Sequence, residues 1–208
     1  MANVERHEFF PTCLYRFKHE FEENELENMI KHIDTHSLSE HNGQTIKRTG
    51  SQTQDEIHKI ETFSNLTNTI INVSKYVLDT QGYMGEIEVT NMWGNILRPQ
   101  SQRTHAPHTH SNNFLSGVFY LKTSSETAPI QFFDPRPQAH VFTPRKKEFN
   151  TLNSNLAQFN SETGYGVVFP SWLQHWVPET KDERISISWN ILVRGEYGEP
   201  NTLQNATI

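Results

Sequence analysis

The chain contains a single cysteine, Cys13, among 208 residues. An intrachain disulfide therefore cannot form, and a zinc site built from several cysteines is excluded. The sequence also lacks a run of about 18 apolar residues, and its first residues lack the apolar core of a signal peptide. We therefore expect a cytoplasmic protein that does not associate with membranes.

Basic residues are also in the minority. The chain has 18 Lys and Arg against 24 Asp and Glu, and its net charge is −6. Such a charge repels nucleic acid, so we expect no nucleic-acid partner, although a local basic patch stays open. With 13 Phe residues the chain can bury one sizeable core, and no segment resembles a linker. A single domain over residues 1–208 is expected.

Hydrophobic periodicity predicts helices only in the first part of the chain. Apolar residues at spacings of three and four predict one helix over about 22–36 and a second over about 63–77. Beyond Gly82 this period disappears, and short apolar stretches alternate with Pro, Gly, Ser and Asn. Helices followed by strands indicate an α+β protein whose β part is a sandwich or closed barrel. We expect the strands near 85–96, 114–122, 129–133, 139–143, 165–169, 174–177 and 184–193.

Two polar segments are long for connections inside a compact domain. Residues 38–57 are punctuated by glycine and are expected to border a substrate, while residues 144–163 could form a lid or a hairpin tip.

Four of the 11 histidines are candidates for a metal site: His105, His108, His110 and His175. If the segment around His108 and His110 is extended, their side chains leave the strand on one side and can share an ion. His175 lies among aromatic and aliphatic residues that would bury its imidazole. Solvent-exposed histidines that gathered by chance are the competing interpretation for each one.

A strand with strict alternation follows His175. In Arg184-Ile185-Ser186-Ile187-Ser188-Trp189-Asn190 the apolar residues take one face and the polar residues the other. Because burying an unpaired arginine is costly, the face with Arg184 should meet an anion or water, unless the strand lies at the surface. Tyr120 shares a face with Ser116 and Val118, and a phenol beside an arginine forms a carboxylate-binding pair, although core packing also explains an aromatic residue there.

Together these stretches resemble the 2-oxoglutarate/Fe(II) oxygenase superfamily, in particular a family of oxygenases of bacteria and their phages. The resemblance spans most of the chain. It rests on Phe9-Phe10-Pro11-Thr12, Trp93-Gly94-Asn95, the stretch from Pro107 to Tyr120, Phe132-Phe133-Asp134-Pro135-Arg136, the stretch from Phe169 to His175, and the strand that starts at Arg184.

The resemblance implies a double-stranded β-helix, or jelly roll, with the two N-terminal helices packed on its major sheet. It also implies iron ligands at His108 and His175, with no catalytic residue beyond the metal centre. The residues implied to bind 2-oxoglutarate are Arg184, Ser186, Tyr120 and Asn95.

One position departs from the superfamily, which has a carboxylate where this chain has His110. Three alternatives follow: His110 ligates as a third imidazole, Asp134 turns in to complete the usual triad, or the site is zinc-like or inactive. We take His108, His110 and His175 as the expected metal ligands.

The function that the resemblance implies is that of an Fe(II)- and 2-oxoglutarate-dependent dioxygenase. Such an enzyme couples decarboxylation of 2-oxoglutarate to succinate with hydroxylation of a C–H bond. The expected partners are O₂ and an unidentified small molecule or protein side chain, and a homodimer is left open. The rival hypotheses are a three-histidine, cupin-like dioxygenase without 2-oxoglutarate and a non-catalytic β-sandwich binding module.

Overall fold

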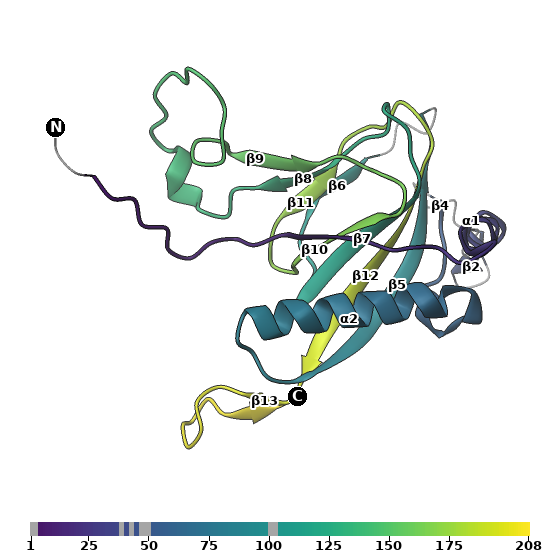
Figure 1. Cartoon of the computed structure of the whole chain (residues 1–208), viewed down its shortest axis with the longest axis horizontal. Helices are drawn as coiled ribbons and strands as arrows, with labels where there is room; N and C mark the ends of the chain where they lie inside the picture. The colour runs from purple at the N-terminus through teal and green to yellow at the C-terminus, as the bar shows by residue number, and fades with distance from the viewer. Residues whose placement is uncertain (1–3, 38–39, 42–43, 46–50, 100–103) are drawn as a thin grey trace.

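Two antiparallel sheets face each other in the computed structural model (Figure 1), which describes residues 4–37, 40–41, 44–45, 51–99 and 104–208. The larger sheet has six strands in the order β1-β10-β7-β12-β5-β4, and the smaller has four in the order β6-β11-β8-β9. Among the described residues the pairs inside both sheets are all antiparallel. This is the expected jelly roll.

The larger sheet draws its strands from the whole length of the chain. Its members are β1 (Tyr15–Lys18), β4 (Ser51–Gln52), β5 (Glu86–Leu97), β7 (Leu115–Lys122), β10 (Tyr165–Pro170) and β12 (Arg184–Arg194). The smaller sheet contains β6 (His105–His108), β8 (Ile130–Phe133), β9 (Leu156–Phe159) and β11 (His175–Val177). Two short hairpins, β2 (Glu40–His41) with β3 (Gln44–Thr45) and β13 (Glu196–Tyr197) with β14 (Ala206–Thr207), lie outside the two sheets.

The helices cover one face of the larger sheet. They are α1 (Glu25–His36) and α2 (Ser64–Thr80), and α2 follows two short 3₁₀ turns, η1 (Ile57–Lys59) and η2 (Glu61–Phe63). Both helices contact β5, and α1 also contacts β7. Figure 1 shows α2 running across the strands of this sheet. The expected packing of two N-terminal helices on the major sheet is therefore confirmed.

The alternation of β12 divides the core into two parts. Ile185, Ile187 and Trp189 are at most 2% exposed and pack with the helices on one side of the sheet. The opposite face turns toward the smaller sheet, where Arg184 and Ser186 are equally buried. A sheet buried on both sides positions polar side chains of β12 inside the sandwich, and these side chains form part of the site described below.

The prediction of a strand near residues 139–143 is wrong. The structure has a 3₁₀ turn, η4 (Pro137–His140), followed by non-strand residues in which Val141 and Phe142 are 80% and 92% exposed. The apolar side chains that suggested a strand are therefore exposed to solvent and do not pack against the core. The Asp134 carboxylate instead accepts hydrogen bonds from Arg136 and lies 3.0 Å from His140 Nε2, which closes this segment into a turn.

Several strands fall outside the expected ranges: β6 and β9 of the smaller sheet, β1 and β4 of the larger sheet, and the four strands of the two short hairpins. β9 lies inside the polar segment 144–163 and pairs with β8, with Phe159 opposite Ile130.

Within the described part of the chain, no helix has the length and apolar character needed to span a membrane.

Candidate metal centre

Three histidines meet between the two sheets, although one of them comes from a distant part of the chain. The pairing of β6 with β11 sets His108 opposite His175. His110 follows β6 rather than lying on it, and its backbone N–H donates to the carbonyl oxygen of Ser171 at 2.9 Å. One ligand nitrogen from each histidine lies within 4.8 Å of the others. The ligand nitrogens of His108 and His110 therefore lie close together, but not because the two residues alternate on one strand, as was expected. His110 lies beyond the end of β6 and is held by Ser171.

Two of these imidazoles are oriented by backbone carbonyl groups. Nδ1 of His108 lies 2.6 Å from the oxygen of Ala106, and Nδ1 of His175 lies 2.9 Å from the oxygen of Leu173. Because a carbonyl only accepts, each Nδ1 carries the proton and each Nε2 keeps a lone pair. This outer hydrogen bond is the usual way in which a protein fixes a metal-binding imidazole.

The geometry fits a divalent cation. Nε2 of His110 and Nε2 of His175 are 3.3 Å apart. Metal–nitrogen bonds of about 2.0–2.1 Å at angles between 90° and 109° separate two ligand nitrogens by roughly 2.9–3.4 Å. Burial lowers the pKa of His175 to about 3 and, aided by His108, lowers that of His110 to about 4. Both imidazoles are therefore neutral at neutral pH, which is the form that ligates.

Aromatic rings enclose the histidine group. Phe169 packs against His175 at a centroid distance of 4.7 Å, and Phe132 lies 5.9 Å from the same ring. On the other side Trp93 is stacked with His110 at 6.2 Å and an interplanar angle of 25°. These contacts restrict the rotation of two of the three imidazoles and limit the access of water.

Arg184 occupies the same interior, where its buried charge meets no carboxylate of the described residues. Its side chain is 1% exposed, Nη1 donates to Ser186 Oγ at 2.9 Å, and Nε lies 3.5 Å from Ser161 Oγ. No acidic residue in the described part of the chain forms an ion pair with it. A guanidinium this deeply buried is costly unless an anion joins it.

Tyr120 adds a second unsatisfied group beside Arg184. Cζ of Arg184 lies 4.9 Å from the centroid of the Tyr120 ring, and the tyrosine is 1% exposed. Its hydroxyl has no hydrogen-bond partner among the described residues. Buried hydroxyl groups rarely remain unpaired, so this group is available to a ligand. The expected pairing of an inward phenol with an arginine is present.

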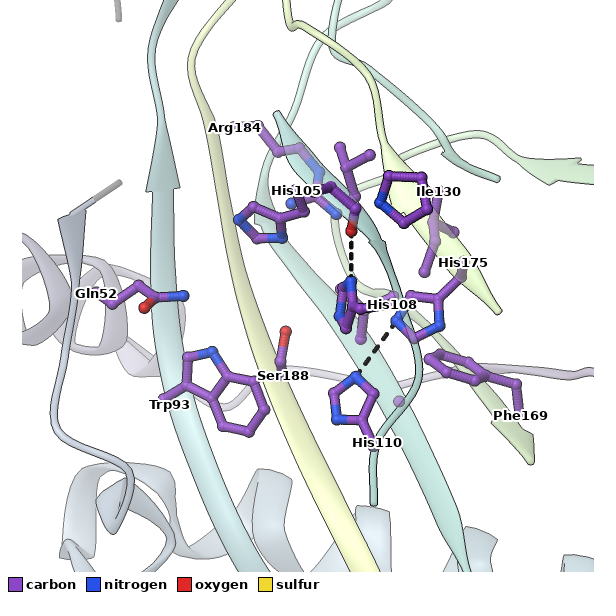
Figure 2. Close-up of a pocket in the computed structure, with 15 residues that line it drawn as sticks. Gln52, Trp93, His105, His108, His110, Ile130, Phe169, His175, Arg184 and Ser188 are labelled. Carbon is purple, nitrogen blue, oxygen red and sulfur yellow. Dashed lines mark hydrogen bonds between the residues drawn. The ribbon is translucent and has the colours of Figure 1, made fainter. Parts of the chain in front are cut away.

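The histidines and Arg184 face one cavity of about 340 Å³ (Figure 2), a size suited to a small ligand. Figure 2 shows Arg184 and His105 toward one end and the three histidines further along. The residues lining the cavity are Gln52, Trp93, His105, Ala106, Pro107, His108, His110, Gly117, Val118, Ile130, Phe169, His175, Val177, Arg184 and Ser188. None of these residues is acidic, so the cavity favours an anionic ligand.

Asn95 is 1% exposed and lies behind residues that line the cavity. Its Oδ1 accepts hydrogen bonds from Gln52 Nε2 at 2.8 Å and Trp93 Nε1 at 3.1 Å, and its Nδ2 donates to Ser188 Oγ at 3.1 Å. The side chain thus orients three residues that line the cavity. The segment 38–57 reaches the cavity through Gln52, whereas residues 38–39, 42–43 and 46–50 lie outside the described residues.

Asp134 does not belong to the histidine group. Its carboxylate is engaged by Arg136 Nη2 at 2.7 Å and by His140, and the hydrogen bonds from Arg136 hold its pKa well below the usual range. This geometry favours His110 over Asp134 as the third member of the site. Gln52 and Ser161 were not singled out from the sequence, because each lies in a polar segment without a periodic pattern.

Residues 91–190 match the model of the family described as "Putative 2OG-Fe(II) oxygenase". These residues include the three histidines, Arg184, Ser186 and Tyr120. Residues 91–190 belong to this 2OG-Fe(II) oxygenase family. The match identifies an enzyme that uses Fe(II) and 2-oxoglutarate, and it speaks against a non-catalytic binding module.

Solved structures share the fold of this oxygenase at low sequence identity. A prolyl-4-hydroxylase from Pseudomonas putida superposes with a TM-score of 0.62 at 12% identity, covering 88% of this chain and 94% of the hydroxylase. The non-heme alpha-ketoglutarate-dependent epimerase SnoN of nogalamycin biosynthesis gives 0.61 at 12% identity, with 92% and 83% covered. The viral collagen prolyl hydroxylase of Paramecium bursaria Chlorella virus-1, solved with 2OG, gives 0.54 at 12% identity, with 86% and 96% covered. No curated protein matches the chain.

Proposed function

We propose that this oxygenase is a hydroxylase whose Fe(II) is held by His108, His110 and His175. The convergence of their three ligand nitrogens supports this assignment. So does the engagement of Asp134 elsewhere. With three neutral imidazoles the site is one unit more positive than a site with two histidines and a carboxylate. That charge strengthens the attraction for a dianionic co-substrate.

The far carboxylate of 2-oxoglutarate is assigned to Arg184, with Ser186 and Tyr120 beside it. Arg184 supplies the charge and Ser186 holds its guanidinium through the 2.9 Å hydrogen bond. Tyr120 offers the hydroxyl that has no other partner. Asn95 contributes to the other end of the cavity, beside His110, where it orients Ser188 and Trp93. The single observation that carries the proposal is the buried Arg184, which has no anionic partner among the described residues and lies in the same cavity as the histidines.

The bound iron and 2-oxoglutarate would supply the oxidising chemistry, in which O₂ converts 2-oxoglutarate to succinate and CO₂ while one C–H bond becomes C–OH. The protein positions the reactants in a cavity from which Phe169 and Phe132 help to exclude water. The primary substrate is expected to approach over the loops at 38–57, 96–107 and 144–163.

The three imidazoles alone would also suit a cupin-like dioxygenase that needs no 2-oxoglutarate. That function leaves a buried guanidinium without an anion and a buried phenol without a hydrogen-bond partner among the described residues, and both are unfavourable. We therefore favour the 2-oxoglutarate-dependent reaction.

The proposal is tested by following succinate. Purified protein is reconstituted with Fe(II) without oxygen, then exposed to O₂ and 2-oxoglutarate, and succinate is quantified beside a metal-free control. We expect slow formation of succinate even without the primary substrate, and much less in Arg184→Gln at the same concentration of 2-oxoglutarate. Binding of both Fe(II) and 2-oxoglutarate with no succinate above the control would overturn the assignment.

A further inference from the structure

A histidine in place of a carboxylate ligand creates a requirement that a carboxylate does not have. An imidazole that binds metal through one nitrogen presents an N–H on the other, and this N–H needs an acceptor. The backbone carbonyls of Ala106 and Leu173 meet that need for His108 and His175. No backbone carbonyl of the described residues takes this role for His110.

Asn190 on β12 is the candidate acceptor for His110. Burial lowers the pKa of His110, and the side chain of Asn190 opposes this shift, as a hydrogen-bond acceptor does. Because Nε2 of His110 is directed at His175, Nδ1 is the nitrogen left for Asn190. Asn190 is 7% exposed, and it pairs across the sheet with Ser116 on β7 and Asn91 on β5. The amide is therefore carried by a central strand of the larger sheet.

A chain of hydroxyl groups fixes which way this amide points. Ser116 Oγ donates to Asn190 Oδ1 at 2.8 Å, and Ser116 Oγ also lies 2.8 Å from Ser171 Oγ. Since the single hydroxyl proton of Ser116 goes to Asn190, Ser171 must be the donor to Ser116. Asn190 Nδ2 lies 3.4 Å from Asn91 Oδ1. These contacts turn Oδ1 toward Ser116, and because this oxygen can accept two hydrogen bonds it has one left for His110.

The same chain also holds the backbone of His110. The N–H of His110 donates to the carbonyl oxygen of Ser171, the residue whose hydroxyl begins the chain, and both Ser116 and Ser171 are fully buried. His110 is thus fixed at its backbone by Ser171 and at its ring by Asn190. On its remaining side Trp93 stacks against the ring.

We propose that Asn190, oriented by Ser116 and Ser171, is the positioning residue that accepts the Nδ1–H of His110 and so directs Nε2 to the metal. This inference rests on the proposed function, because it presupposes that His110 is a ligand. An amide accepts this hydrogen bond without adding negative charge to a cavity that is to hold a dianion. A carboxylate ligand has no N–H to donate, so it would not need this acceptor.

A double-mutant cycle on the full-length protein tests the pairing, with Co(II) alone as the probe and without 2-oxoglutarate or O₂. The dissociation constant and the visible spectrum of bound Co(II) are the readouts. Asn190→Leu, which removes the acceptor, should weaken Co(II) binding by about 10–100-fold and alter the spectrum. In a His110→Asp background the same change should alter the affinity less than about 3-fold. Equal weakening in both backgrounds would overturn the proposal.

Two further variants keep the test decisive if His110→Asp binds no Co(II) or Asn190→Leu folds poorly. Asn190→Asp retains the shape and the acceptor, so it should bind Co(II) at least as well as the wild type, and a loss as large as that of Asn190→Leu would overturn the proposal. Ile191→Val, on the opposite face of the same strand, should lower stability by about 0.5–1.5 kcal/mol and leave Co(II) affinity unchanged. Loss of affinity in Ile191→Val would mean that any loosening of β12 weakens the site, which contradicts the proposal. A wild type that binds no Co(II) would refute the proposed function itself.

Discussion

Nε2 of His110 and Nε2 of His175 lie 3.3 Å apart although 65 residues separate them in the chain. Their approach depends on the pairing of β6 with β11 and on the hydrogen bond from His110 to Ser171. Without a metal the two nitrogens share one hydrogen bond, in which His175 Nε2 accepts because its Nδ1 carries the proton. A cation would replace this bond with two metal–nitrogen bonds. The metal should therefore stabilise the folded state.

Thermal unfolding under anaerobic conditions measures this stabilisation. At a metal concentration of 100 times the dissociation constant the gain is about 2.7 kcal/mol. For a domain of this size that gain corresponds to a rise in Tm of roughly 5–10 °C. We expect the rise for Fe(II) or Co(II) with the wild type and none with His110→Ala. A variant lacking His110 that keeps the full rise would contradict the ligand assignment.

Asp134 offers a matched contrast, since it is the acidic residue that could otherwise complete the site. Asp134→Asn should leave the metal-induced rise in Tm intact. It should lower the stability of the metal-free protein by about 1–2 kcal/mol at neutral pH, because the carboxylate accepts charged hydrogen bonds from Arg136.

The pH dependence of that loss follows from the pKa of Asp134, which Arg136 holds below its ordinary value. A carboxyl whose pKa is depressed in the folded state stabilises fully above its unfolded pKa of about 3.9, and the stabilisation falls as pH decreases below that value. The difference between wild type and Asp134→Asn should therefore be constant from about pH 5 to 8 and should shrink below about pH 4. A difference that grows on acidification would show that the ion pair is not its source.

Arg184→Gln separates co-substrate binding from metal binding. Loss of a charged hydrogen bond costs about 1.5–3 kcal/mol, so the dissociation constant for 2-oxoglutarate should rise by roughly 10–150-fold while Co(II) affinity stays the same. Arg194→Gln is the control, because Arg194 ends the same strand at an exposed site where it pairs with Glu88. Calorimetric titration of both variants checks the expectation. A loss of metal affinity in Arg184→Gln would mean that its role has been misplaced.

The hydroxyl of Tyr120 should affect binding and stability in opposite directions. Without a ligand it is a buried polar group that lacks a partner. Tyr120→Phe should therefore leave the protein without ligand as stable as the wild type or more stable, and should weaken 2-oxoglutarate binding by about 3–10-fold. Denaturant unfolding with and without 2-oxoglutarate measures both effects. A large loss of stability in the absence of ligand would indicate a structural hydrogen bond instead.

Much of the site could be predicted because β12 alternates strictly. Period-two alternation predicted Arg184 and Ser186 on one face of the strand and Ile185 and Ile187 on the other. In the structure both faces of β12 are buried, with the polar and apolar side chains on opposite sides of the sheet. Tyr120 was placed by the same rule on β7. The three histidines converge as expected, although His110 lies after β6 and its position depends on Ser171, a long-range contact with no local signal.

The errors lie where tertiary contacts override local sequence. Residues 139–143 have the composition of a strand, yet the hydrogen bonds of Asp134 close the preceding residues into a turn, and the segment pairs with none of the described strands. β9 has only four residues in a polar segment and gains its strand conformation from pairing with β8. The link between Asn190 and His110 joins β12 to the residues after β6, and such pairings are invisible without the fold.

The most direct test of the central claim is the visible absorption of the Fe(II)-loaded protein on addition of 2-oxoglutarate without oxygen. Chelation of iron by 2-oxoglutarate gives a weak metal-to-ligand charge-transfer band. We expect that band in the wild type and not in His110→Ala. Fe(II) bound by the wild type with no band at saturating 2-oxoglutarate would contradict the account and favour a three-histidine dioxygenase that does not use 2-oxoglutarate.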